Sequence, residues 1–240
     1  MFKLENLRIV LVEPDHPGNI GGACRALKTM GLTDLRLIAP KRFPDPQAQW
    51  RAAGAQDVLE AARVHDHLEE AIDDCHCVVG TSTRSRTIPW PVVSARGLAE
   101  RVLAMPADAR VAILFGRETN GLHNEELQRC DLHLQIPANP DYPSLNLAMA
   151  VQVVCYELFA QAEQAPAIIA DSDRPPATNA EVEAIIEHLS RAAVESGFVA
   201  ADNPGQTLTR LRRLLRRADL DRTEVQMLHG LLRALGAPLR

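Results

Sequence analysis

The stretch VAILFGRETNGL, residues 111–122, combines a strongly apolar run with a charged turn. Five consecutive apolar residues, 111–115, are typical of a short strand that is buried on both faces. Gly116 ends this run and is followed at once by Arg117 and Glu118, and a glycine at the end of a buried strand allows a ligand or another backbone to approach closely. An Asn-Gly turn and a helix start with two glutamates come next. The stretch therefore predicts a strand, a glycine corner, a charged loop and a helix, which taken alone fits an ordinary strand-to-helix connection best.

Further apolar runs of strand length alternate with helical segments along the first two thirds of the chain. The predicted strands are residues 7–12, 35–39, 77–80, 111–115 and 132–137. The predicted helices are residues 20–30, 47–54, 66–73 and 145–160, of which the last is apolar on nearly every side. This alternation indicates the α/β class, with a mainly parallel sheet that is covered by helices on both faces.

Composition limits the class of protein and its partners. The chain has 240 residues, 46% of them hydrophobic, and a net charge of −5, so it can form a sizeable core. The acidic balance argues against a protein that coats nucleic acid indiscriminately, and any RNA binding must rest on local basic patches. No apolar run approaches membrane-spanning length and residues 1–12 lack a signal-peptide pattern, so we expect a cytoplasmic protein without a membrane partner.

The cysteines do not indicate a metal site. No CxxC pair occurs among the five, which are Cys24, Cys75, Cys77, Cys130 and Cys155. The triplet at residues 75–77 invites a metal interpretation, but it leads into an apolar run and is better explained as the start of a strand. We therefore expect reduced thiols and no metal required for folding.

The loop after the first strand, GNIGG at residues 18–22, leads into the first predicted helix. Asn19 fits the N-cap of that helix, and Gly31 fits its C-terminal cap. The glycines lack the G-x-G-x-x-G spacing and no well-placed acidic residue follows the second strand, so a Rossmann oxidoreductase is a weaker interpretation. Arg25 lies about one turn into the helix, where position alone predicts a solvated side chain.

Two more loops carry polar groups at strand ends. The loop TSTRSR, residues 81–86, contains hydroxyls and two arginines but no acid. Such groups suit a ribose, a phosphate or a carboxylate, and a solvated turn is an equally good interpretation. After residues 132–137, a polar loop with two prolines leads into SLNL, residues 144–147, at the start of the apolar helix.

Three of these segments together form an ordered set of motifs. They are N-x-G-x-x-x-R from Asn19 to Arg25, Gly-Arg-Glu at residues 116–118, and Ser-Leu-Asn-Leu at residues 144–147. In this order they resemble the signature motifs of the SPOUT-class RNA methyltransferases. The likeness extends over LRIVLVE, GTSTRSRTIPWP and NPDYPSLNLAMAVQV, and it is strongest to members that act on tRNA. It implies transfer of a methyl group from S-adenosylmethionine to the ribose 2′-OH of nucleotide 32, a cytidine or uridine of the anticodon loop.

The same resemblance implies a fold, an assembly and a cofactor site. Members of the class have a C-terminal trefoil knot and form homodimers with the site at the interface. S-adenosylmethionine is held by three loops at the carboxyl edge of the sheet, which here correspond to Thr81, Ser82, Thr83, Gly116, Ile136, Pro143, Ser144 and Leu145.

The chemistry assigns four candidate catalytic residues. In-line transfer to a hydroxyl needs alignment and removal of the hydroxyl proton. Arg25 is expected to hold the adjacent phosphate and the hydroxyl, because an arginine with a pKa above ~12 is a poor general base; some proposals for the class nevertheless make it the base. Ser144 is expected to orient the hydroxyl or the cofactor, and Asn19 to fix Arg25. Glu118 is expected to neutralise an arginine or shape the site, with a role as base as the weaker alternative.

Two other functions stay open from the sequence. A base methyltransferase of the same class often uses an acidic residue to deprotonate the base, and the sequence offers no clear candidate for it. A non-catalytic RNA-binding module of the same fold is the second alternative, against which the intact motifs argue.

The remainder of the chain predicts a separate helical part. We expect a methyltransferase domain at residues 1–162, a linker at residues 163–177 and a small all-helical C-terminal domain at residues 178–240, with capping boxes at residues 178–181 and 223–226. Five arginines with no acid among them cluster in this part of the chain: Arg210, Arg212, Arg213, Arg216 and Arg217. Such a cluster is either a solvated face or a phosphate-binding one. Together with Arg84 and Arg86 it forms the predicted tRNA-binding set.

Overall fold

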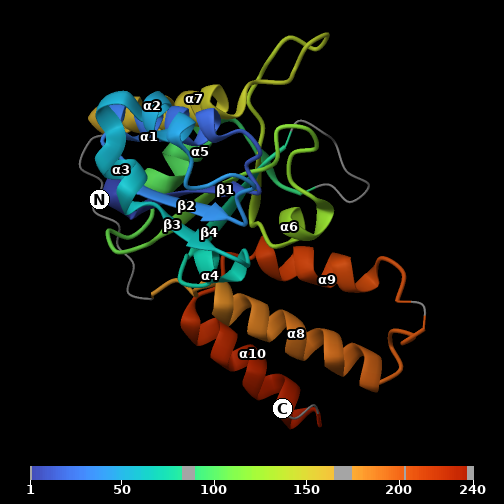
Figure 1. The fold of residues 1–240 in the computed structure, drawn as a ribbon. Helices are drawn as coiled ribbons and strands as arrows, with labels where there is room; N and C mark the ends of the chain where they lie inside the picture. The colour runs from blue at the N-terminus through green and yellow to red at the C-terminus, as the bar shows by residue number, and fades with distance from the viewer. Residues whose placement is uncertain (1, 83–89, 165–174, 203, 237–240) are drawn as a thin grey trace. The chain divides into compact units, whose positions relative to one another are not determined.

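A parallel seven-stranded sheet forms the centre of the first part of the chain (Figure 1). The strand order is β3-β2-β1-β6-β4-β7-β5, and each adjacent pair is parallel. The strands are β1 Leu7–Val12, β2 Asp34–Ile38, β3 Arg63–His65, β4 Cys77–Thr81, β5 Val92–Val93, β6 Val111–Phe115 and β7 Leu132–Leu134. The predicted α/β class with a mainly parallel sheet is confirmed, whereas the strand predicted at residues 132–137 is only three residues long.

The computed structural model describes residues 2–82, 90–164, 175–202 and 204–236. The chain divides into two compact units, Met1–Asp171 and Ser172–Arg240. The predicted linker at residues 163–177 lies mostly outside the described residues, so its boundaries stay predictions. The trefoil knot that the resemblance implies also stays a prediction.

Helices cover both faces of the sheet in the first unit (Figure 1). One hydrophobic cluster joins a face of the sheet to α1 Pro17–Thr29, α2 Pro46–Ala52, α3 Gln56–Ala61, α5 Ala95–Leu103 and α7 Leu147–Gln164. A second cluster joins the other face to α4 Glu69–Ile72 and α6 Asn124–Gln128. Short 3-10 turns at Leu4–Asn6 and Ala53–Ala55 complete the unit. Within the described chain, no helix combines the length and apolar character that a membrane crossing needs.

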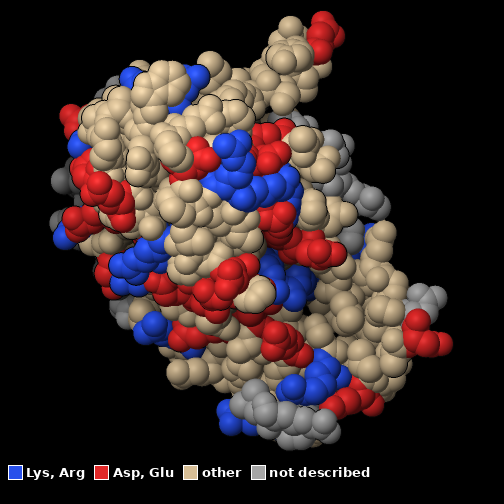
Figure 2. Space-filling model, in the orientation of Figure 1, with Lys and Arg blue, Asp and Glu red and all other residues tan. Residues whose placement is uncertain are grey.

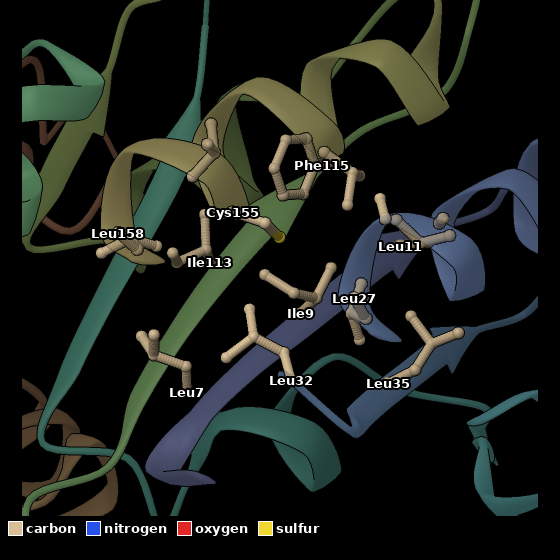
Figure 3. Close-up of a cluster of buried hydrophobic side chains, with 14 of the residues drawn as sticks. Leu7, Ile9, Leu11, Leu27, Leu32, Leu35, Ile113, Phe115, Cys155 and Leu158 are labelled. Atoms are coloured by element: carbon tan, nitrogen blue, oxygen red, sulfur yellow. The ribbon is translucent and has the colours of Figure 1, made fainter. Parts of the chain in front are cut away.

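Alternating side chains of the central strands enter the two clusters. On β1, Ile9 and Leu11 belong to the first cluster while Val10 belongs to the second. On β6, Ile113 belongs to the first and Leu114 to the second. Figure 3 shows the first cluster, where these strands meet side chains of α1 and α7. Since successive side chains of a strand point to opposite faces, burial of both faces explains why these strands are apolar without interruption.

Helix α1 is held unusually close to its neighbours. A Cβ atom at Gly21 would lie 2.2 Å from the carbonyl oxygen of Ala48 in α2, and one at Gly22 would lie 2.8 Å from Cβ of Ala148 in α7. Only glycine therefore allows these two contacts. The helix also begins earlier than predicted, at Pro17, and its N-cap is His16. Asn19 lies in the first turn, so the prediction that it caps the helix is wrong.

The second unit consists of three helices, α8 Asn179–Glu195, α9 Thr207–Arg216 and α10 Arg222–Ala234. Its core contains Val182, Ile185, Ile186 and Val225, all buried. The capping box at residues 178–181 is confirmed. The second capping box uses Asp221 and Glu224 instead of residues 223–226, because α10 begins at residue 222.

Candidate active site

A cavity of about 480 Å³ opens where β4, β6 and β7 end. Its walls come from three segments: the end of β4, the loop after β6, and the chain from residue 136 to the start of α7. The carboxyl edge of a parallel sheet is the usual place for a ligand. Every described residue of the predicted cofactor set lines it, namely Thr81, Ser82, Gly116, Ile136, Pro143, Ser144 and Leu145. Thr83, Arg84 and Arg86 lie outside the described residues.

The first wall segment continues the sheet beyond β4. The hydroxyl of Thr81 donates to the carbonyl oxygen of Leu114 on β6 at 2.9 Å. The N–H of Ser82 donates to the carbonyl oxygen of Leu134 on β7, also at 2.9 Å. These bonds join β4 to both neighbouring strands at the rim of the cavity, and the Thr81 hydroxyl thereby fixes the wall.

Gly116 accommodates a turn of the protein itself. A Cβ atom at Gly116 would lie 2.1 Å from the carbonyl carbon of Gly121 and 2.2 Å from the backbone nitrogen of Leu122. Arg117 and Gly121 exchange backbone hydrogen bonds, N–H of Arg117 to O of Gly121 at 3.2 Å and N–H of Gly121 to O of Arg117 at 2.9 Å. Of the two sequence alternatives, approach of a ligand or of another backbone, the structure shows the second: this turn folds back against Gly116.

Arg117 ties the same loop to two other elements. Its guanidinium donates to both carboxylate oxygens of Glu13, which follows β1, and to Glu126 of α6 at 2.9 and 3.1 Å. The side chain is 11% exposed. The hydrogen bond from Arg117 holds the pKa of Glu13 below its ordinary value, and the two carboxylates raise the pKa of Arg117. Arg117 therefore serves to anchor the cavity wall.

A chain of side-chain hydrogen bonds connects the three sequence motifs. Glu118 accepts from Nδ2 of Asn19 at 2.8 Å and from the backbone N–H groups of Asp15 and His16 at 2.9 and 3.1 Å. Nδ2 of Asn146 donates to Oδ1 of Asn19 at 2.9 Å. The relay Glu118–Asn19–Asn146 thus joins the loops after β1 and β6 to the start of α7.

The relay also decides what Glu118 can do. Burial raises the pKa of this carboxyl, but the bonds from Asn19 and from two backbone N–H groups outweigh burial and lower it below its ordinary value. An ionised carboxylate that accepts three hydrogen bonds is a weak acceptor for a substrate proton. Glu118 therefore fits a role in shaping the site, which was the favoured interpretation from the sequence.

Asn146 extends the relay into helix α7. Its Oδ1 atom accepts from the backbone N–H groups of Ala148 at 3.0 Å and Met149 at 3.4 Å. The residue therefore caps the helix while its amide nitrogen holds Asn19. Ser144 lies two residues earlier, lines the cavity and is exposed.

The structure does not bring Arg25 into the cavity of its own chain. Arg25 is exposed on α1 and is not a lining residue. Asn19 bonds to Glu118 and Asn146, so the expectation that it fixes Arg25 is not what the side-chain contacts show. The single chain thus unites Asn19, Glu118 and Ser144 around the cavity and leaves Arg25 apart.

The arginines of the second unit are not equivalent. Arg212 donates to both oxygens of Glu183 on α8 at 2.5 and 2.7 Å, and Arg216 donates to the same carboxylate. Burial raises the pKa of Glu183, but Arg216 and Arg212 outweigh it and lower the pKa below its ordinary value. Arg216 is buried at 2% exposure, so its prediction as a phosphate contact is wrong: an acid from another helix pairs with it.

The other members of that cluster have different surroundings. Arg210 and Arg217 are exposed, and Arg213 is half-buried. Figure 2 shows that on the visible face Lys and Arg are interleaved with Asp and Glu. Basic character is therefore local, as the net charge predicts.

Sequence reasoning missed two parts of this site. Glu13 was not expected to hold Arg117, although the residue directly follows β1 and the pairing of Leu11 with Phe115 places the two strand ends side by side. The relay through Asn146 was also missed, and its signal is the position of an asparagine just before the helical residue Leu147.

Sequence and structure comparisons agree over nearly the whole chain. The profile of the SpoU rRNA Methylase family matches residues 6–156, and that of the C-terminal domain of the tRNA methyltransferase TrmJ matches residues 180–240. The tRNA (cytidine/uridine-2′-O-)-methyltransferase TrmJ of Klebsiella pneumoniae subsp. pneumoniae is 46% identical over 236 residues, 97% of each chain. The crystal structure of TrmJ from Z. mobilis ZM4 has a TM-score of 0.82 at 34% identity and covers 95% of this chain and 98% of that one.

A more distant structure shares the fold. It is the SpoU methyltransferase AviRb from Streptomyces viridochromogenes in complex with AdoMet, with a TM-score of 0.55 and 23% identity over 67% of this chain and 62% of that one. The AviRb structure supports the fold alone. The family profile and the extent of identity to TrmJ establish that the chain belongs to the SpoU methylase family and is a methyltransferase.

Proposed function

We propose that the protein transfers a methyl group from S-adenosylmethionine to the ribose 2′-OH of nucleotide 32, a cytidine or uridine in the anticodon loop of tRNA. The observation that carries the proposal is the cavity at the carboxyl edge of the sheet, two of whose walls, the loop after β6 and the segment before α7, are joined through Asn19 of α1 by the Glu118–Asn19–Asn146 relay. The name of the Klebsiella relative supports a tRNA ribose as the acceptor. A cytoplasmic location follows from that substrate.

The lining of the cavity suits S-adenosylmethionine. Its volume of about 480 Å³ falls within the usual range for small-molecule sites, which is roughly 300–1,000 Å³. Leu122, Ile136 and Leu145 supply apolar surface for an adenine. The backbone N–H and C=O groups of the loops bind the edge of the adenine, and Ser82 lines the same cavity and can bind a polar group of the cofactor. When bound, the cofactor supplies the electrophilic methyl group.

The protein's own contribution to the reaction is alignment of the acceptor. Ser144, exposed at the cavity rim, orients the 2′-OH or the cofactor. Arg25 holds the neighbouring phosphate and stabilises the hydroxyl oxygen as its proton leaves, because a guanidinium stays charged and donates several hydrogen bonds. Asn19 and Glu118 fix the loops on which this alignment depends.

A homodimer brings Arg25 to a cavity. Helix α7 exposes an apolar stripe, Met149, Val153 and Tyr156, spaced i, i+4 and i+7. Helix α1 lies against α7 at Gly22, so Arg25 projects from the element that flanks this stripe. We propose that a second copy covers the stripe and that Arg25 of one copy serves the cavity of the other.

The second unit contributes tRNA affinity. Arg210, Arg213 and Arg217 are the members of the arginine cluster proposed to bind phosphates, with Arg84 and Arg86 near the site. Arg212 and Arg216 instead stabilise the bundle through Glu183. Removing the second unit is therefore expected to weaken tRNA binding more than it changes the chemical step.

The alternatives fit the cavity less well. A base methyltransferase that deprotonates its base needs an available acid, and Glu118 is the one carboxylate among the described residues that line the cavity; it already accepts three hydrogen bonds. A non-catalytic RNA-binding module has no need for a cofactor-sized cavity.

The test uses the purified full chain with labelled S-adenosylmethionine and unmodified tRNA transcripts. The proposal predicts label in tRNA, located at nucleotide 32 as a 2′-O-methyl group. A matched tRNA with a single 2′-deoxy substitution at nucleotide 32 should accept no label. Label in that tRNA at an unchanged rate would contradict the proposed acceptor, and absence of cofactor binding by calorimetry would favour the RNA-binding module.

A further inference from the structure

Trp50 of helix α2 is a tryptophan that the core does not use. The sequence contains two tryptophans. Trp90 is buried, donates from Nε1 to the carbonyl oxygen of Cys130 at 2.8 Å and stacks on His133. Trp50, in contrast, is 73% exposed. Its large flat ring therefore adds little to the stability of the fold and is available for an external contact.

The position of α2 places Arg51, the neighbour of Trp50 in the sequence, against the helix that carries Arg25. A Cβ atom at Gly21 would lie 2.2 Å from the backbone of α2, and one at Gly18 would lie 3.5 Å from Cγ of Arg51. Gly18, Gly21 and Arg25 are spaced i, i+3 and i+7, so they share one side of α1. Arg25 thus projects on the side of α1 that faces α2, one turn beyond the closest contact of the two helices.

One cation lies over the ring, and a second lies on the neighbouring helix α1. The guanidinium carbon of Arg51 lies 5.3 Å from the centroid of the Trp50 ring. Within the described chain, neither Arg51 nor Arg25 forms an ion pair or a side-chain hydrogen bond. Proteins bind single-stranded nucleic acid with accessible aromatic rings and with guanidinium groups that have no carboxylate partner. Bases stack on the rings and phosphates bind the cations.

Neighbouring cations, in contrast, form ion pairs with carboxylates. Lys28 of α1 pairs with Asp57 at 2.7 Å, and Arg42, which precedes α2, pairs with Asp45 at 2.9 Å. The positive charge that remains without a carboxylate on this pair of helices is therefore concentrated at Arg25 and Arg51.

We propose that Trp50 and Arg51 form a stacking platform for an unpaired base of the RNA substrate, adjacent to the nucleotide whose ribose is methylated. The proposal rests on the proposed function, because it takes the RNA loop as the ligand. The indole ring holds one base and Arg51 binds a phosphate beside it, while Arg25 on the neighbouring helix binds another phosphate of the same strand. The platform selects an unstacked loop over a duplex, in which no base is free to stack on a protein ring.

The substitutions separate stacking from apolar contact. Trp50→Leu keeps an apolar side chain but removes the ring, and it should weaken binding of an anticodon stem-loop RNA by about tenfold or more, with unchanged affinity for S-adenosylmethionine. Trp50→Phe keeps an aromatic face and should restore most of the binding. Val64→Ala, at another exposed apolar residue of the same unit, is the matched control and should bind RNA like the wild type.

Fluorescence gives a direct readout that does not depend on methylation. Because Trp90 is buried, a base that stacks on the protein quenches the emission of Trp50. Addition of the stem-loop should quench wild-type emission, whereas Trp50→Phe should lose that quenching, and a fully paired RNA duplex should produce little. Equal RNA affinity of the wild type and Trp50→Leu, or quenching that survives in Trp50→Phe, would overturn the platform.

The outcomes also separate the stacking platform from the proposed function and from the proposed homodimer. If the wild type methylates tRNA but the stem-loop leaves Trp50 emission unchanged, the platform is wrong and the proposed function stands. If the stem-loop quenches Trp50 but no tRNA is methylated, the proposed function fails and the platform stands. Light scattering supplies the last check, because a lower mass for Trp50→Leu than for the wild type would show that the ring contacts a second copy and would overturn the platform.

Discussion

The cavity wall of the first unit and the arginine-rich helix α9 of the second unit each contain an arginine that could bind a ligand or pair with an acid of the protein. In both regions the arginine pairs with an acid. In each, the sequence shows an arginine in a place that suits a ligand. The structure pairs Arg117 with Glu13 and Glu126, and Arg216 with Glu183. The partners come from other elements of the same unit. An arginine that is paired and buried stabilises the fold, while Arg25 is exposed and has no carboxylate partner among the described residues, as its proposed role in substrate binding requires.

The largest effect is expected from Gly116→Leu, which acts on the wall itself. The new Cβ atom would lie 2.1 Å from the backbone of Gly121, so the turn after β6 must move and the cavity must change shape. We expect binding of S-adenosylmethionine to be lost in calorimetry while circular dichroism shows a folded chain. Gly54→Leu is the control, because a Cβ atom at Gly54 meets nothing within 4 Å. Cofactor affinity retained in Gly116→Leu would show that the wall does not depend on this turn.

The next largest effect is a difference in stability and tRNA binding between substitutions of two neighbouring arginines of the same cluster. Arg216→Met leaves Arg212 as the one described partner of the partly buried Glu183. It should lower the free energy of unfolding of the second unit by about 3 kcal/mol, as expected when one partner of a buried ion pair is removed. Arg217→Met, at an exposed residue, should change stability by less than about 0.5 kcal/mol but reduce the slope of tRNA affinity against salt by about 1. Urea denaturation and a salt series of tRNA binding measure both; equal stability losses would remove the distinction.

The smallest effect is a pH dependence of the cavity wall. The pKa of Glu118 is lowered in the folded state, so its contribution to stability is fully present above its unfolded pKa, which is about 4.3, and is lost as pH falls through the lower folded value. Glu118→Gln should therefore lose less stability between pH 6 and pH 3, about the range of ordinary carboxyl titration, than the wild type. Glu60→Gln, at an exposed residue of α3, is the control. Parallel pH profiles for the wild type and Glu118→Gln would show that the relay contributes no stability.

Much of the fold follows from local patterns in the sequence. The apolar runs of β1 and β6 were predictable, because a strand with two buried faces is apolar over most of its length. The long helix α7 was predictable from its apolar composition, although its residues Met149, Val153 and Tyr156 are exposed in the single chain. Short elements were not: β5 has two residues and β3 has three, too few to show a period. The start of α1 was predicted too late. Asn19 is a favoured N-cap residue, but His16 caps the helix and Pro17 begins it.

The sequence does not predict the hydrogen bonds of the site that join residues far apart in the chain. Glu118 and Asn19 are 99 residues apart, and Asn146 and Asn19 are 127 apart. Their meeting depends on the order β1-β6-β4-β7 in the sheet, which no local pattern contains. The motif resemblance pointed to loops that line the cavity, but only the structure shows that Asn19 bonds to Glu118 and Asn146 and that Arg25 does not line the cavity of its own chain.

The proposed function assigns different roles to the residues that build the cavity and to Arg25, which is proposed to act on the acceptor. The most direct test is the single-turnover rate of methyl transfer at saturating tRNA and S-adenosylmethionine for Arg25→Ala, with Lys28→Ala on the same helix as the control. We predict a rate lower by about 100-fold or more for Arg25→Ala with nearly unchanged cofactor affinity, because an interaction made mainly in the transition state is lost. A near-normal rate for Arg25→Ala would contradict the assignment of the active site.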